Sequence, residues 1–249
     1  MADGISELRK LLAESRRVVF FTGAGISTES GIPDFRSPGG LWNRYRPIEF
    51  GEFMASAEAR KEYWRRKIET DKVLLVAQPN RGHRAIAKLI ETGKASAVIT
   101  QNIDGLHQAS GIPAGKVIEL HGNTTYATCL DCGERYELEP IKQAFVTDGA
   151  LPECTACMGI IKPATIAFGQ AMPQGPMHQA EIETVACDLF ISVGSSLVVY
   201  PAAGFPALAH EQGASLVIVN REPTPLDGMA RMTIRGEIGS VLGDAVGVN

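Results

Sequence analysis

The sequence predicts an α/β fold: a doubly wound parallel sheet with helices on both faces and a smaller lobe attached. Short apolar runs alternate with segments of helical periodicity, which is typical of parallel sheets. Polar loops follow these runs, and a cysteine-rich stretch interrupts the alternation. We expect a single domain over 1–249 that comprises a Rossmann-like large lobe (1–37, 79–121 and 166–249), a helical insertion (38–78) and a cysteine module (122–165).

Length, charge and composition narrow the class of protein. The chain has 249 residues, enough for one large domain or a domain with a small lobe. Its net charge of −4 disfavours a general nucleic-acid binder, which needs a basic surface. No apolar stretch approaches the length that a membrane-spanning helix needs. The N-terminus lacks the basic and apolar regions of a signal peptide. We therefore expect a cytoplasmic monomer with no membrane partner and no specific nucleic-acid partner.

The first elements lead into a glycine turn. Apolar residues at helical spacing predict an amphipathic helix over about 4–14, and the apolar run 18–21 predicts a strand buried on both faces. The strand ends at Gly23-Ala24-Gly25, where small residues allow a tight turn and free backbone N–H groups attract a phosphate. An ordinary glycine turn is the alternative, because Thr28 replaces the third glycine of the dinucleotide fingerprint.

An aromatic and charged segment, 38–78, breaks the simple alternation. Its part 57–70 has a helical pattern, and we interpret the segment as a helical insertion or lid whose aromatic residues mostly form a core of their own. A second helix then begins at Asn80, a suitable N-cap, and ends at Gly93.

Further strands and helices complete the predicted sheet. We expect strands at 95–100, 117–120, 188–193, 215–219 and 231–234, and helices near 176–186 and 201–212. Ligands of such sheets bind at the carboxyl ends of the strands. Polar loops fall at those ends, at 23–36, 101–104, 121–122, 194–196 and 220–222. The sequence therefore predicts one convergent site.

The cysteines predict a structural metal site. Cys129 and Cys132 form one Cys-x-x-Cys pair, Cys154 and Cys157 form another, and 21 residues separate the pairs. That spacing is close to that of four-thiolate zinc ribbons, which leave no open position for a substrate. A redox dithiol or buried free thiols are the alternatives. The fifth cysteine, Cys187, precedes a predicted strand and is expected to pack in the core.

Two polar motifs at strand ends carry candidate chemistry. Gln101-Asn-Ile-Asp104 brings amides and a carboxylate to one strand end, although such a loop often only satisfies its own backbone. His121 follows another strand. An imidazole is well suited to take a proton from a hydroxyl, although a lone histidine is more often structural.

Chemically specific blocks follow one another along nearly the whole chain. They are Gly23-Ala-Gly-Ile-Ser27, Gly31-Ile-Pro-Asp-Phe-Arg36, Thr100-Gln-Asn-Ile-Asp104, His121-Gly122, the four paired cysteines, Lys162-Pro163 through Phe168-Gly169, Gly194-Ser-Ser-Leu197 and Val219-Asn-Arg-Glu222. Together they resemble the sirtuin family, the NAD-dependent protein-lysine deacylases, in the form of a bacterial-type catalytic core. Gln170 stands where many members have Glu, and Ser195 where many have Thr, but both keep hydrogen-bonding capacity.

The resemblance implies a binding site for NAD, which is consumed as a co-substrate. The diphosphate is expected on the glycine turn and the nicotinamide in an inner pocket, where Asp104 accepts a hydrogen bond from the carboxamide. The residues implied in NAD binding are Gly23, Ala24, Gly25, Ser27, Thr28, Asp34, Phe35, Arg36, Gln101, Asn102, Ile103, Asp104, Gly194, Ser195, Ser196, Asn220, Arg221, Glu222 and Ile238.

The resemblance also implies the reaction, with His121 and Asn102 as catalytic residues. The acyl oxygen attacks the ribose carbon as nicotinamide leaves, and His121 then deprotonates a ribose hydroxyl as general base. The products would be lysine, nicotinamide and O-acyl-ADP-ribose. The substrate's peptide would add as a strand between 168–170 and 196–198. The implied substrate residues are Tyr63, Arg66, Ile166, Phe168, Gly169, Leu197 and Val198.

The acyl group and the rival activities remain open at this point. Members that prefer acidic acyl groups such as succinyl carry a Tyr-x-x-Arg pair, and Tyr63 and Arg66 have that spacing. A slip of one residue in the alignment would place Trp64 and Lys67 at these positions instead. We favour the interpretation that these are exposed charges of the helix, so we expect acetyl-lysine as the main substrate.

Three other activities are the alternatives: a mono-ADP-ribosyltransferase, an NAD-dependent dehydrogenase and a non-enzymatic NAD-sensing module. The sequence lacks the full glycine fingerprint that a dehydrogenase needs.

Overall fold

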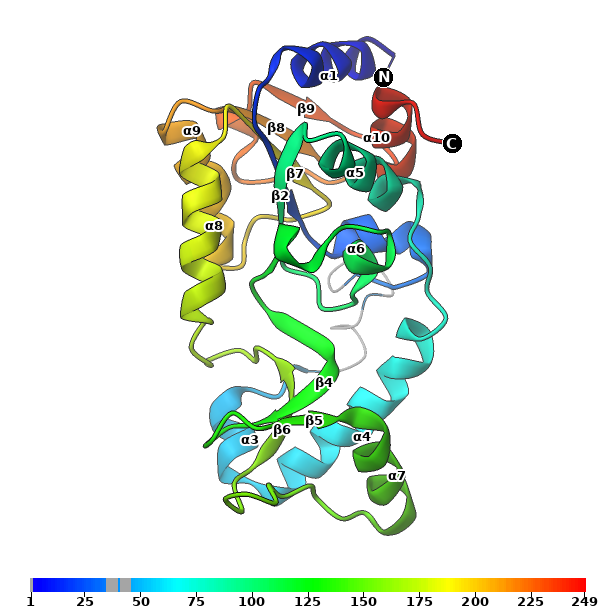
Figure 1. Ribbon diagram of the computed structural model, residues 1–249, viewed down its shortest axis with the longest axis vertical. Coiled ribbons are helices and arrows are strands. Elements are labelled where there is room, and N and C mark those ends of the chain that lie inside the picture. The colour runs from blue at the N-terminus through cyan, green and yellow to red at the C-terminus, as the bar shows by residue number, and fades with distance from the viewer. Residues whose placement is uncertain (1, 35–39, 41–45) are drawn as a thin grey trace.

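The structure is a computed structural model that describes residues 2–34, 40 and 46–249. Phe35 and Arg36, two of the residues implied in NAD binding, lie outside the described residues. The described chain forms a large lobe around a parallel sheet and a smaller lobe around an antiparallel one (Figure 1).

The large lobe is built on a six-stranded sheet in the order β3-β2-β1-β7-β8-β9. Every neighbouring pair in it is parallel. The order places β1 and β7 side by side at the centre, where the chain switches from one half of the sheet to the other; ligands of such sheets bind at this switch point. The strands are β1 (Val18–Thr22), β2 (Ala95–Thr100), β3 (Val117–Glu119), β7 (Leu189–Val193), β8 (Ser215–Val219) and β9 (Met232–Ile234).

Helices cover both faces of this sheet, as the sequence predicts. Alternate β1 side chains divide between the faces, with Phe20 in one apolar core and Phe21 in the other. The first core also contains apolar side chains of α1 (Ala2–Glu14), α5 (Arg81–Glu91) and α10 (Ile238–Val246). The second contains those of α8 (Gln174–Ala186) and α9 (Phe205–Glu211) (Figure 1). The six predicted strands are confirmed within about one residue at each end.

Helix α10 was not predicted, because two glycines interrupt its apolar pattern. A side chain at Gly239 would collide with the Glu29 carboxylate, and one at Gly243 with the Arg81 guanidinium. These glycines therefore make room for polar side chains of neighbouring elements. In contrast, the predicted N-cap of α5 is confirmed, since the Asn80 side chain accepts from the backbone N–H groups of Gly82 and His83.

Among the described residues, the small lobe contains the antiparallel sheet β5-β4-β6 and the helices α3, α4 and α7. The predicted helix at 57–70 is confirmed and extends to Leu74, but the sheet and α7 were not predicted. The fully buried Trp64 packs with Ala127 and Ile161 of the sheet, so this aromatic residue of the insertion shares a core with the cysteine module. The elements are α3 (Phe50–Ala55), α4 (Ala57–Leu74), β4 (Gly122–Cys129), β5 (Arg135–Glu137), α7 (Leu138–Asp148) and β6 (Ile161–Thr165).

Short helical turns complete the described chain. They are η1 (Ala24–Ser30), α6 (Leu106–Ala109), η2 (Ala114–Lys116), η3 (Ala202–Gly204) and η4 (Asp227–Met229). Within the described ranges, no helix combines the length and the apolar character that crossing a bilayer requires.

Candidate active site

A cavity of about 570 Å³ is lined by residues of both lobes. It lies at the carboxyl ends of β1, β2, β7 and β8, where the polar loops were predicted to converge. Of the predicted NAD-binding residues that the structure describes, every one lines it: Gly23, Ala24, Gly25, Ser27, Thr28, Asp34, Gln101, Asn102, Ile103, Asp104, Gly194, Ser195, Ser196, Asn220, Arg221, Glu222 and Ile238.

The glycines of the first turn allow two loops of the switch point to touch. A Cβ atom at Gly25 would lie 2.7 Å from Cα of Gly194, and one at Gly194, whose φ is +63°, would lie 2.4 Å from the backbone N of Ile26. The N–H groups of Gly23, Gly25 and Ile26 donate to backbone carbonyls. The N–H groups of Gly23 and Gly25 are therefore not free for a phosphate, because the loop contacts use them.

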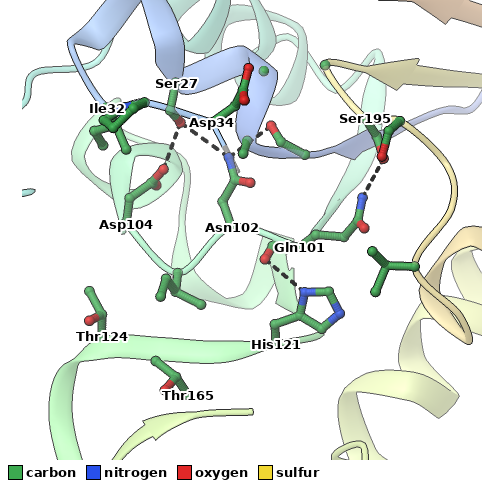
Figure 2. Close-up of a pocket in the computed structure, with 18 of the residues that line it drawn as sticks. Ser27, Ile32, Asp34, Gln101, Asn102, Asp104, His121, Thr124, Thr165 and Ser195 are labelled. Atoms are coloured by element: carbon green, nitrogen blue, oxygen red, sulfur yellow. Dashed lines mark hydrogen bonds between the residues drawn. The ribbon is translucent and has the colours of Figure 1, made fainter. Parts of the chain in front are cut away.

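Asn102, Asp104 and Ser27 form a connected polar group at one end of the cavity (Figure 2). The Asn102 amide donates to the Gly23 carbonyl over 3.1 Å and to Ser27 Oγ over 3.2 Å. Ser27 Oγ in turn donates to Asp104 Oδ2 over 2.7 Å. Burial raises the pKa of Asp104, while its hydrogen bonds from Leu106 N–H and Ser27 oppose that shift.

His121 lines the same cavity with one ring nitrogen already engaged. Its Nδ1 lies 3.0 Å from the Gln101 carbonyl oxygen. A carbonyl can only accept, so Nδ1 carries the hydrogen and Nε2 of the neutral ring keeps a lone pair. Burial lowers the pKa of His121, against the hydrogen bond to Gln101, which raises it. Figure 2 shows the second ring nitrogen turned away from Gln101. The residue can therefore accept a proton at Nε2 near neutral pH.

Gln101 links His121 to the loop after β7. Its backbone carbonyl accepts from His121, and its side-chain amide donates to Ser195 Oγ over 2.8 Å (Figure 2). Ser195 is buried. The loops after β2 and β7 and the segment after β3 that carries His121 are therefore held together by hydrogen bonds.

The cavity extends into the small lobe along one face of α4. Tyr63 is half-buried, and its hydroxyl lies 2.9 Å from Thr165 Oγ1 of β6. Arg66 also lines the cavity, but its guanidinium donates to Glu62 over 2.7 Å and to the Arg46 carbonyl over 2.6 Å. Thus neither Tyr63 nor Arg66 is simply exposed on the helix surface, and Arg66 already has partners.

The predicted peptide-binding residues divide into two groups. Ile166, Phe168 and Gly169 line the cavity. Leu197 and Val198 do not: Leu197 is buried in the core of the large lobe, and Val198 is 45% exposed. The assignment of these two residues to the peptide site stays a prediction.

Charged residues that the sequence analysis partly missed also line the cavity. Arg221 forms an ion pair with Glu237 over 2.9 Å, and Glu29 accepts from the backbone N–H of Gly239 over 2.7 Å. Both glutamates line the cavity with Glu222. Glu237 precedes α10, the helix that the sequence analysis missed, whereas Glu29 lies in the predicted loop 23–36 but had no assigned role.

Further lining residues come from elements that sequence patterns place poorly. On α4, Lys67, Thr70 and Leu74 continue the face that begins at Tyr63, and helical periodicity could have found them once the inward face was known. Thr124 and Thr165 come from β4 and β6, strands that the sequence analysis did not predict.

The four predicted metal ligands meet away from the cavity. The sulfur atoms of Cys129, Cys132, Cys154 and Cys157 all lie within 4.8 Å of one another. Zinc bound by thiolates at about 2.3 Å would separate tetrahedral sulfurs by roughly 3.8 Å. The Cys129–Cys157 and Cys132–Cys154 sulfur pairs lie 3.5 and 3.6 Å apart. The cysteines are thus positioned to bind one zinc ion, while Cys187 is buried apart from them, as predicted.

The sequence is similar to one family of proteins along most of its length. The model of the Sir2 family matches residues 23–201. An NAD-dependent protein deacetylase of Bradyrhizobium diazoefficiens is 57% identical over 99% of this chain and 97% of its own length. One of Rhodopseudomonas palustris is 55% identical over 99% and 98%.

Solved structures give the same answer for the fold. A Sir2 histidine-to-alanine variant with a deacetylated p53 peptide and 3′-O-acetyl-ADP-ribose aligns with a TM-score of 0.90 at 38% identity, covering 98% of this chain and 99% of the other. A Sir2 complex with a p53 peptide and NAD⁺ aligns with a TM-score of 0.86 at 39% identity, covering 96% and 95%.

Proposed function

The chain belongs to the Sir2 family, and from this premise we propose that it is an NAD-dependent protein-lysine deacetylase. The reaction converts acetyl-lysine, NAD and water to lysine, nicotinamide and O-acetyl-ADP-ribose. The observation that carries the proposal is the arrangement of His121: a neutral imidazole lines the same cavity as the polar group around Asn102 and Asp104.

His121 is the general base in this proposal. Its Nδ1–H is held by the Gln101 carbonyl, so Nε2 is the atom that takes a proton from a ribose hydroxyl of the co-substrate. Since burial lowers the pKa of the imidazole, the ring is neutral at physiological pH and ready to accept that proton.

Asn102 and Asp104 would bind and orient the nicotinamide end of NAD. Asp104 Oδ2 now accepts from Ser27, and the same oxygen can accept from a carboxamide N–H. Asn102 is fixed by its bonds to Gly23 and Ser27, so its side chain holds one orientation at the cavity wall. Positioning of this kind contributes much of the rate when the nucleophile is a weak amide oxygen.

The loops after β1, β7 and β8 would bind the rest of NAD. Ser195 and Ser196 bring hydroxyl groups to the switch point between β1 and β7, where dinucleotides bind in such sheets. Asn220 and Glu222 would hold the adenosine ribose, and Ile238 would lie near the adenine. These roles are supported by the position of each residue in the cavity lining.

The acetyl-lysine would reach the cavity from the peptide side. Ile166 and Phe168 supply apolar surface there, and the backbone of 168–170 and 196–198 would pair with the peptide. Backbone pairing tolerates many substrate sequences, which suits an enzyme that acts on protein lysines. Arg66 is already bonded to Glu62 and Arg46, which supports acetyl over acidic acyl groups.

The zinc ion has a structural role in this proposal. Four thiolates complete a tetrahedral site and leave no position for a substrate. Cys129 and Cys154 belong to the buried core of the small lobe together with Trp64, so the ion would hold that lobe together.

Oligomeric state, location and nucleic-acid binding remain proposals from the sequence. We expect a cytoplasmic monomer without a specific nucleic-acid partner. Analytical ultracentrifugation of the purified chain would test the first point, since a stable dimer would contradict it.

The experiment that tests the function is an acyl-peptide panel with and without NAD, analysed by mass spectrometry. We expect loss of the acetyl mass only with NAD and formation of O-acetyl-ADP-ribose. A gain of ADP-ribose on the peptide would instead indicate a transferase, and no acyl-dependent change would indicate a non-enzymatic protein.

A further inference from the structure

A buried polar network lies behind Asn102 and outside the cavity lining. It contains Thr22 at the end of β1, Thr100 at the end of β2 and His107 in α6, which are 0%, 2% and 1% exposed. None of the three lines the cavity. Any effect they have on the reaction must therefore pass through a neighbour that does.

The network reaches the backbone of Asn102. The Asn102 N–H donates to Thr100 Oγ1 over 3.0 Å. Thr22 Oγ1 donates to Thr100 Oγ1 over 2.8 Å and lies 2.8 Å from His107 Nε2. Thr22 is therefore the central member of the network: it is bonded to Thr100, which accepts from the Asn102 N–H, and to His107.

The directions of these bonds assign the hydrogen on His107. Because the Thr22 hydroxyl hydrogen goes to Thr100, the Thr22 oxygen accepts from His107, so His107 carries its hydrogen on Nε2. Its Nδ1 is then a bare acceptor, and it is buried with no partner in the described part of the chain.

A second buried histidine supports this assignment. His83 Nδ1 accepts from the Asn80 N–H over 3.3 Å, so in the neutral ring its hydrogen is on Nε2, an atom that also lacks a partner among the described residues. The His83 and His107 rings are 5.0 Å apart. The opposite tautomer of His107 would leave two buried donors without acceptors on these neighbouring rings, which is costly. Burial lowers the pKa of His83 to about 4 and that of His107 to about 3, so both rings are neutral.

We propose that Thr22 and His107 are positioning residues for the deacetylation: through Thr100 they fix the backbone of Asn102 and so the direction of its side-chain amide. The inference rests on the proposed function, since it assigns Asn102 to the reaction. Buried hydrogen-bond networks gain strength from the low dielectric around them. A displacement of about 1 Å at a positioned group can cost about 10²-fold in rate.

Two substitutions at Thr22 test the inference. Thr22→Val keeps the shape and removes the hydroxyl, whereas Thr22→Ser keeps the hydroxyl and removes the methyl group. We expect Thr22→Val to lower kcat about 10–100-fold with KM for NAD within about threefold, and Thr22→Ser to keep both within about threefold of the parent. Equal activity of Thr22→Val and the parent, or of the two variants, would overturn the inference.

A matched control accounts for the general cost of losing a buried threonine hydroxyl. Thr184 is 0% exposed, its hydroxyl donates to the Ala180 carbonyl within α8 over 2.7 Å, and it does not line the cavity. Thr184→Val should therefore leave kcat unchanged. A loss of kcat in this variant as large as in Thr22→Val would overturn the specific role of the network.

An NMR measurement that does not depend on enzymatic activity can test this inference separately from the proposed function. The ¹⁵N chemical shifts of the His107 imidazole in the parent protein at pH 7 should show the neutral Nε2–H tautomer. A charged ring or the Nδ1–H tautomer would overturn the network whatever the enzyme does. A parent that releases no nicotinamide with an acetylated peptide, yet shows the expected tautomer, would contradict the function alone.

Discussion

The Nδ1 atom of His121 lies 3.0 Å from the backbone carbonyl oxygen of Gln101, and this bond leaves Nε2 as the basic atom of the ring. Gln101 also holds Ser195 through its side chain, so the same residue orients the base and anchors the loop after β7. The direction in which His121 can accept a proton is thus fixed by the backbone, which few substitutions can alter.

Replacing His121 by Ala should lower turnover of an acetylated peptide about 10²–10⁴-fold, the usual contribution of a positioned general base. NAD should still bind, because the loops expected to hold its phosphates and adenosine are unchanged. Steady-state kinetics and calorimetric titration with NAD would measure the two effects. His178→Ala is the control, since its side chain is 74% exposed on α8. Near-parent deacetylation by His121→Ala would remove this residue from the role.

The pH dependence of kcat/KM should carry the signature of a depressed histidine pKa. Burial lowers the pKa of His121 from the ordinary value of 6.5, and a base acts only when unprotonated. The rate should therefore stay level as pH falls to about 6.5 and decline only below it. His83 and His107, with pKa values of about 4 and 3, do not titrate in this range. A decline that begins well above pH 6.5 would contradict this account of the base.

Replacing Gly194 by Ala should destabilise the protein and weaken NAD binding. The left-handed backbone at φ +63° costs a non-glycine residue about 1–3 kcal/mol. In addition, the new Cβ would lie 2.4 Å from the backbone N of Ile26, forcing apart the two loops of the switch point. Chemical denaturation and NAD titration would measure both effects. Gly175→Ala in α8 is the control, because no atom lies within 4 Å of its Cβ position; equal behaviour of the two variants would count against the loop contact.

Loss of zinc should unfold the small lobe before the large one. Cys154 is fully buried, and Cys154→Ser should abolish binding of the single zinc ion expected per chain and lower the melting temperature. Cys187→Ser, which changes a buried cysteine outside the cluster, should keep the zinc. Metal analysis with thermal denaturation tests this, and full zinc occupancy in Cys154→Ser would refute the four-thiolate site.

Acetyl-lysine should be turned over faster than succinyl-lysine. The Arg66 guanidinium already donates to Glu62 and to the Arg46 carbonyl, so a second carboxylate would have to compete with the Glu62 carboxylate for it. Arg66→Met should therefore leave the preference for acetyl intact. Competing peptides analysed by mass spectrometry would show it, and a succinyl preference that Arg66→Met reverses would overturn this assignment.

The large lobe could be predicted well because its strands are continuous apolar runs that end in polar loops. A parallel strand buried on both faces, such as β1, leaves this pattern directly in the sequence. The cysteine spacing likewise indicated the metal site, since two-residue gaps turn paired thiolates toward one ion.

The rest depended on tertiary context that no local pattern reports. Glycine lowers helical propensity, so Gly239 and Gly243 weaken the helical signal of α10, and only the folded protein shows that they make room for Glu29 and Arg81. The short strand β5, of three residues, has exposed flanks and too little alternation to be recognised. The engaged N–H groups of Gly23 and Gly25 follow from contacts with Val193 and Gly194, which lie about 170 residues further along the chain.

The most direct test of the account is the stoichiometry of one reaction mixture that contains the protein, NAD and an acetylated peptide. We predict equal amounts of deacetylated peptide, nicotinamide and O-acetyl-ADP-ribose by mass spectrometry, with no nicotinamide when the peptide lacks its acetyl group. Nicotinamide release that is independent of the acetyl group, or deacetylation without NAD, would contradict the account.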